Sequence, residues 1–109
     1  MNIIIINHYA GSPDFGMEFR PYYLAKEWIK LGHKVTIIAA DFSHLRKQQP
    51  LIKQNTEQQN IDGINYIFFK TPPYKGNGKD RVLNMFSFVK QLTQNAKKIA
   101  NTINPNIVI

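Results

Sequence analysis

The segment that decides the fold is NIIII at residues 2–6, NHYAGSPDFGM at 7–17, a helical stretch ending in Lys30-Leu31-Gly32, and KVTIIA at 34–39. A short apolar run, a crossover helix and a second apolar run are typical of a parallel βαβ unit. Ligands bind at the carboxyl ends of the strands in such units. The long polar loop at 7–17 is therefore the first place to look for chemistry.

The rest of the chain extends this α/β pattern. The first helix begins at Glu18 or later, because Pro21 is tolerated only in a first turn, and it ends at Gly32. Strands are predicted at 35–40, 64–70 and 106–109, with a short hairpin partner at 60–61 before the Asp62-Gly63 turn. We expect a parallel, Rossmann-like sheet with flanking helices.

Two amphipathic faces are predicted to cover the sheet. The apolar face of the first helix comprises Leu24, Ala25, Trp28, Ile29 and Leu31. A second helix at 81–103, capped by Asp80, has an apolar stripe with Leu83 and Phe88 at or beyond its margins. That stripe comprises Val82, Met85, Phe86, Val89, Leu92, Ala96, Ile99, Ala100 and Ile103.

Composition narrows the class of partner. The 109 residues include 14 Lys and Arg against 7 Asp and Glu, so the net charge is +7, and there is no cysteine. A dispersed positive charge favours small phosphates or an anionic membrane surface over nucleic acid. The absence of cysteine excludes a disulfide scaffold, and the three histidines lack ligand spacing, so no metal site is predicted. The opening apolar run is too short for a signal peptide, which favours a cytoplasmic location.

Several polar residues follow the predicted strands. Gly11 and Gly16 precede a helix N-terminus, where backbone amides bind phosphate oxygens, or they supply only turn geometry. Arg20 can pair with phosphate or bridge Glu18 or Asp14. His8 follows the first strand as a ligand-binding or a structural histidine.

The second polar group lies further along the chain. Ser43, His44 and Arg46 follow the second strand and either contact an acceptor or form a solvated connection. Lys75 lies in a basic loop that is suited to an anionic group or is simply solvated. Asp41 offers a nicotinamide alternative, because an acid after a second strand can bind ribose, but the dinucleotide glycine pattern is missing.

With these residues in view, the chain resembles the N-terminal domain of GT-B glycosyltransferases of family 4, and within it the fucosamine-transferase-like subgroup of O-antigen and capsule biosynthesis. The resemblance is carried by HYAGSP at 8–13, GMEFRPYYLA at 16–25, residues 28–33, SHLR at 43–46, DGI at 62–64, Tyr74, GNG at 76–78 and RVLNM at 81–85.

The resemblance implies transfer of a sugar, with retention, from a nucleotide-diphosphate donor to a lipid-linked saccharide at the inner face of the plasma membrane, without a cofactor. It assigns Gly11, Gly16 and Arg20 to the donor diphosphate. It assigns the acceptor to the polar residues that follow the strands, which are His8, Ser43, His44, Arg46 and Lys75.

It also implies that residues 1–109 are an incomplete acceptor-side domain. The C-terminal Rossmann-like partner domain and the catalytic residues are expected beyond Ile109. This segment is therefore expected to be inactive alone. Two alternatives stay open: a NAD-dependent sugar-nucleotide epimerase or reductase, and a basic module that binds nucleic acid or membrane.

Overall fold

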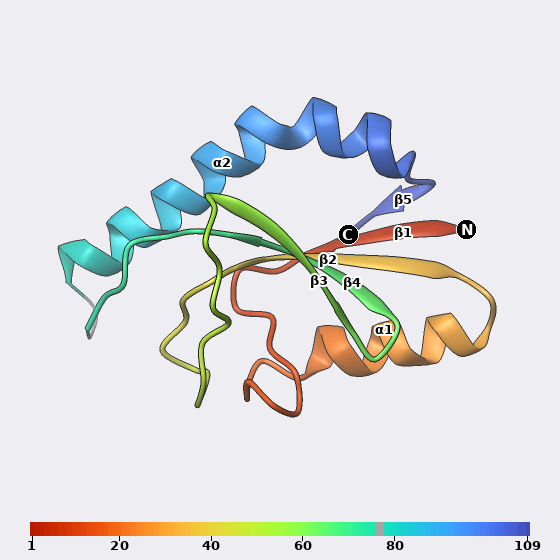
Figure 1. Cartoon of the computed structure of the whole chain (residues 1–109), viewed down its shortest axis with the longest axis horizontal. Coiled ribbons are helices and arrows are strands. Elements are labelled where there is room, and N and C mark those ends of the chain that lie inside the picture. Colours follow the sequence, from red (N-terminus) through yellow and green to blue (C-terminus); the bar gives the residue numbers. More distant parts are fainter. Residues whose placement is uncertain (76–77) are drawn as a thin grey trace.

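A computed structural model describes residues 1–75 and 78–109 of the chain (Figure 1). Gly76 and Asn77, part of the family-like GNG segment, lie outside the described residues. The elements follow the predicted order, with one strand longer than expected. They are β1 (Asn2–Ile6), α1 (Arg20–Lys30), β2 (Lys34–Ala40), β3 (Thr56–Ile61), β4 (Ile64–Phe69), α2 (Lys79–Ile103) and β5 (Ile107–Val108).

The strands form one five-stranded sheet in the order β3-β4-β2-β1-β5. β1 pairs in parallel with both β2 and β5, and β2 pairs in parallel with β4, as predicted. The sheet is nevertheless mixed, because β3 pairs antiparallel with β4 along six residues. The hairpin turn is made by Asp62 and Gly63, both with positive φ, which suits a two-residue turn. The α/β class is confirmed. The short hairpin partner predicted at 60–61 is a longer strand, Thr56–Ile61, so the sheet is mixed rather than parallel at this edge.

Two apolar layers cover the sheet, one on each face. Figure 1 shows α1 and α2 on opposite sides of the strands. On the α1 side, Tyr22 and Ala25 pack against Ile37, Tyr66 and Phe68 of the sheet. The α2 side holds a second cluster, composed of Ile4, Ile38, Ala40, Ile67, Phe69 and Phe88. Alternate residues of each strand thus serve opposite faces, as the period of a strand requires.

The first helix follows the prediction at its ends and departs from it on its surface. It begins at Arg20, places Pro21 in its first turn, and is followed by Gly32 at φ +92°. Leu24 and Leu31 are exposed, which corrects their assignment to the core. Tyr22 takes the buried position, because its ring reaches the sheet while its hydroxyl donates to Asp62 at 2.5 Å.

The second helix is rotated relative to the predicted stripe. Leu92, Ile99 and Ile103 pack on the sheet as expected, but the stripe is wrong in the first half of the helix. There Phe88 and Asn84 are buried instead. Asp80 is also not the N-cap, because Gly78 occupies that position. The apolar residues of this half that face solvent are Val82, Leu83, Met85, Phe86 and Val89.

Candidate functional site

A hydrogen-bonded chain of polar side chains crosses the carboxyl ends of three parallel strands. Asp41, directly after β2, accepts from the backbone and hydroxyl of Thr71 at 2.8 and 3.0 Å. Asn84 of α2 donates to the Thr71 hydroxyl at 2.8 Å and to the Pro72 carbonyl at 2.7 Å. The Asn84 amide oxygen meets Nε2 of His8, which lies two residues after β1. The network therefore links the ends of β1, β2 and β4 to the start of α2.

This network fixes the proton of His8. Both amide hydrogens of Asn84 are used by Thr71 and Pro72, so its oxygen faces the imidazole and Nε2 must donate. The Nδ1 atom is then left as an acceptor, and it is buried with no hydrogen-bond partner among the described residues. Burial, reinforced by the charge of Arg46 and Arg81, lowers the pKa of His8 despite the hydrogen bond that its Nε2 donates to Asn84. His8 is thus a neutral base whose buried lone pair has no donor among the described residues.

Aromatic rings and a guanidinium surround His8. Its ring lies 4.6 Å from that of Tyr9, and Tyr9 lies 5.8 Å from the ring of His44. The Tyr74 hydroxyl is hydrogen-bonded to Nδ1 of His44 at 2.7 Å and accepts from the His44 backbone amide at 3.1 Å. Arg81 donates to the Tyr9 hydroxyl at 3.1 Å. Aromatic walls with a few convergent polar groups are the usual composition of a small-molecule site.

The structure brings together part of the predicted acceptor set. His8 and His44 flank Tyr9, and Lys75 is exposed beside Tyr74. These residues, with Arg81, form what we call the carboxyl-edge site.

Two other predicted acceptor residues are turned into the protein. Ser43 is fully buried, and its hydroxyl accepts from the backbone of Leu45 at 3.2 Å. Arg46 is buried and donates through Nε and Nη2 to the Ala10 carbonyl at 3.1 and 2.6 Å. Burial lowers the pKa of Arg46 to about 10. The structure thus places both side chains in internal contacts away from the exposed surface, and Arg46 anchors the loop after β1.

The glycines of that loop serve its internal packing. The amide of Gly11 donates to Glu18 at 2.8 Å, and that of Gly16 donates to Ser12 at 2.7 Å. A Cβ on Gly11 would lie 1.8 Å from the Gly16 carbonyl oxygen, and Gly16 itself has φ +101°. Both amides are already bonded, so the geometry supports the turn interpretation of these glycines over a phosphate cradle.

Arg20 stands apart from the carboxyl-edge site. It is exposed as the first residue of α1, and its backbone amide donates to the Glu18 carboxylate at 3.4 Å. No contact among the described residues links Arg20 to His8 or to the glycine amides.

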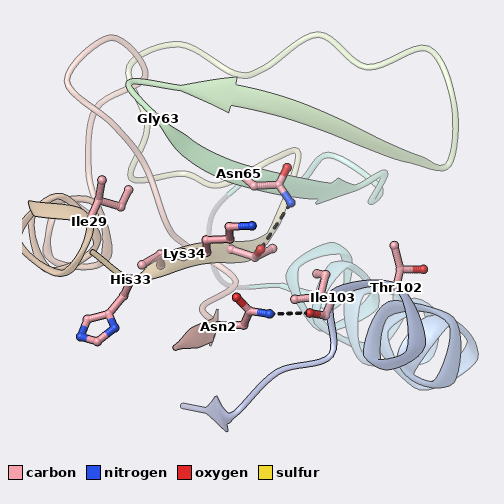
Figure 2. Close-up of a pocket in the computed structure, with 10 residues that line it drawn as sticks. Asn2, Ile29, His33, Lys34, Gly63, Asn65, Thr102 and Ile103 are labelled. Carbon is pink, nitrogen blue, oxygen red and sulfur yellow. Dashed lines mark hydrogen bonds between the residues drawn. The ribbon is translucent and has the colours of Figure 1, made fainter. Parts of the chain in front are cut away.

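A cavity of about 470 Å³ lies at the opposite end of the strands. Figure 2 shows Asn65 and Asn2 bonded within it, and these side chains donate to Thr36 at 3.3 Å and to the Ile103 carbonyl at 3.0 Å. The lining amides are thus satisfied by the protein. We place the candidate site at the carboxyl edge because the unpartnered acceptor on His8 lies there.

Sequence reasoning missed Asn84, Thr71 and Tyr9 as site residues. The available signal for Asn84 was its spacing of four from Phe88 and of eight from Leu92, which defines a second helical face. Nothing in the sequence pairs Thr71 with Asp41, because that contact depends on β2 and β4 being neighbours.

The described parts of the chain contain no cluster of three or more His, Cys, Asp or Glu side chains able to hold a metal ion. Within the same residues, neither helix has the length and apolar character needed to cross a bilayer. No protein-family model, curated protein or solved structure matches the chain.

Proposed function

We propose that the chain is the acceptor-side, N-terminal domain of a retaining family 4 glycosyltransferase of GT-B fold. The whole protein moves a sugar from a nucleotide-diphosphate donor to a lipid-linked saccharide in surface polysaccharide biosynthesis, at the inner face of the plasma membrane. The observation that supports this proposal best is the unpartnered Nδ1 of His8, oriented by Asn84 at the carboxyl end of β1.

The carboxyl-edge site offers the chemistry that a saccharide acceptor requires. A sugar hydroxyl donates to Nδ1 of His8, and the rings of Tyr9 and His44 provide apolar walls for the sugar. Tyr9 and Phe88 pack against the His8 ring, so this contact requires the Tyr9 ring to move when the hydroxyl binds. Lys75 and Arg81 suit the pyrophosphate of a lipid-linked acceptor.

Within this proposal, the protein contributes mainly orientation. A neutral histidine held by a closed hydrogen-bond network places one acceptor hydroxyl with little loss of freedom at the moment of reaction. Stabilisation of the leaving diphosphate is assigned to the proposed partner domain, because Gly11 and Gly16 have no free amide for it.

The nicotinamide alternative receives less support. Asp41, the acid on which it rests, ties the end of β2 to Thr71, with two hydrogen bonds on one carboxylate oxygen. Its position is explained by the network without any ribose.

The test is a nuclear magnetic resonance titration of the isotope-labelled chain with a soluble saccharide pyrophosphate carrying a short alkyl chain. We expect shifts at His8, Tyr9, His44 and Tyr74, abolished in His8→Ala. The matched control, His33→Ala, changes a histidine at the opposite end of the strands and retains the shifts.

Calorimetry with nucleotide sugars complements this titration, and very weak binding is expected. Micromolar affinity for a nucleotide sugar, or saccharide shifts confined to the cavity of Figure 2, contradicts the proposal.

A further inference from the structure

The first half of α2 carries a row of apolar side chains that face solvent. Val82, Phe86 and Val89 are 49%, 68% and 55% exposed, and their spacing of four and three places them on one side of the helix. Leu83 and Met85 flank the row and are exposed as well. We call these five residues the apolar face of α2.

The orientation of this face is set by the residues on the other side of the helix. Phe88 packs on Phe69 with ring centres 5.7 Å apart, and Asn84 is held by the buried network. These anchors direct Val82 and Phe86 away from the sheet. Single exposed apolar side chains are common on proteins, but a contiguous row usually marks an interaction surface.

Positive charge lies on the same side of α2 as the apolar face. Lys79, Lys90 and Lys97 are separated by eleven and seven residues, so they form a line along the helix, and Phe86 lies on this same line between Lys79 and Lys90. The single acid of α2, Asp80, lies two residues from Val82 and so projects from the opposite side. The exposed side of the helix therefore combines apolar and basic side chains, and its lysines lie among the residues of the apolar face.

We propose that this face of α2 docks on an anionic lipid surface, with the helix lying in the plane of the headgroups. An apolar row inserts at the acyl boundary while lysines meet lipid phosphates, which is how interfacial amphipathic helices bind. Lysines beside a membrane phosphate gain attraction, whereas a symmetric contact between two copies would set the row of Lys79 and Lys90 against its own counterpart. Charge therefore favours lipid over a second copy of the chain.

The position of the face relative to the carboxyl-edge site gives the docking a purpose. Asn84 and Arg81 belong to the same turns of α2 as Val82, and they hold His8 and Tyr9. Docking of this part of α2 therefore places the carboxyl-edge site close to the lipid headgroups. This role for docking rests on the proposed function, because only a membrane-borne acceptor requires the site to lie near the lipid. The docking itself does not depend on the proposed function.

Vesicle co-sedimentation tests the proposal. The chain is expected to bind vesicles of equal parts phosphatidylglycerol and phosphatidylcholine, and to remain free with phosphatidylcholine alone. Phe86→Ser should weaken binding about tenfold, as expected for loss of one inserted aromatic side chain. The pair Lys79→Gln and Lys90→Gln should weaken it about tenfold or more. Leu51→Ser and Lys53→Gln, in an exposed loop distant in sequence, are the matched controls and should bind as the wild type does.

Two results overturn the proposal. One is vesicle binding that is absent or equally affected by the control variants. The other is a dimer, measured by light scattering, that Phe86→Ser converts to monomer, because the occupant is then a second copy. The saccharide titration is carried out without vesicles and monitors the signals of His8. A failure of saccharide binding is therefore distinguishable from a failure of membrane docking. Circular dichroism of each variant verifies that the exposed substitutions leave the fold intact.

Discussion

Replacing Asn84 with alanine tests the central feature of the carboxyl-edge site. Asn84 is fully buried, and its amide is the only group that joins His8 to the Thr71–Asp41 pair among the described contacts. Alanine keeps the helix but removes both donors and the acceptor. The variant therefore isolates the contribution of the network.

The cost follows from the partners that are left behind. The Nε2 hydrogen of His8 loses its acceptor in a partly buried position, which costs about 1–3 kcal/mol. The bond to the Thr71 hydroxyl contributes about 1 kcal/mol more, while the exposed Pro72 carbonyl turns to water. We expect a total of roughly 2–4 kcal/mol, against a stability of about 5–15 kcal/mol for a domain of this kind. The melting temperature should fall by about 10 °C or more.

The assay is urea unfolding followed by the fluorescence of Trp28, the only tryptophan. Trp28 packs in the core on the α1 side, so its signal reports unfolding of the whole sheet rather than local change at Asn84. Asn101→Ala is the matched control, because it makes the same change at an exposed position of α2 and should cost less than about 0.5 kcal/mol. If the two variants unfold at the same urea concentration, the network does not hold the site together.

Three further predictions concern His8 and the glycines. The pKa of His8 is lowered in the folded state, so the unfolded chain binds more protons as the pH falls below 6.5. The free energy of unfolding, measured by urea titration, should therefore drop between pH 7.5 and 5. The variant His8→Gln should show a flatter dependence on pH. Long-range nitrogen–proton spectra should show His8 protonated at Nε2, and Asn84→Asp should raise its pKa, whereas an Nδ1-protonated ring would contradict the network. In the same unfolding assay, Gly11→Ala should lower stability by about 3 kcal/mol or more, because the new Cβ meets the Gly16 carbonyl. Gly32→Ala, at φ +92° but with open space around it, should lower stability by about 1 kcal/mol. Equal costs for the two variants would refute the close approach at Gly11.

Much of the fold was predictable because local signals agreed with one another. The βαβ unit followed from two buried apolar runs and a helix bounded by Pro21 and Gly32. The edge strand β3 was underestimated, since TEQQNI carries only one apolar residue and its pairing comes from the Asp62-Gly63 turn. Strand propensity depends on neighbours, and an exposed edge strand shows little of it in sequence.

The site was only partly predictable, for a reason of topology. His8 and His44 were predicted to lie together because residues that follow parallel strands share one edge of the sheet, and the structure places both beside Tyr9. The buried state of Ser43 and Arg46 was not visible in sequence. It arises because the loop after β2 folds back to bond Ala10, a contact between segments 36 residues apart. Polar loop residues therefore divided into ligand-facing and loop-anchoring sets that composition alone does not separate.

The rotation of α2 connects the site to the apolar face. Burying Val82 and Phe86 would have satisfied the hydrophobic pattern of the helix, yet the sheet receives Asn84 and Phe88 instead. A folded chain that exposes its more apolar helical face accepts a conflict between local pattern and global packing, and such conflicts concentrate at functional surfaces. Here the same rotation places Asn84 against His8 and turns the apolar row outward. The rotation of α2 therefore determines both the hydrogen-bond network and the surface proposed to bind lipid. Substitutions on the buried side of α2 should change the stability of the network, and substitutions on the exposed side should change vesicle binding.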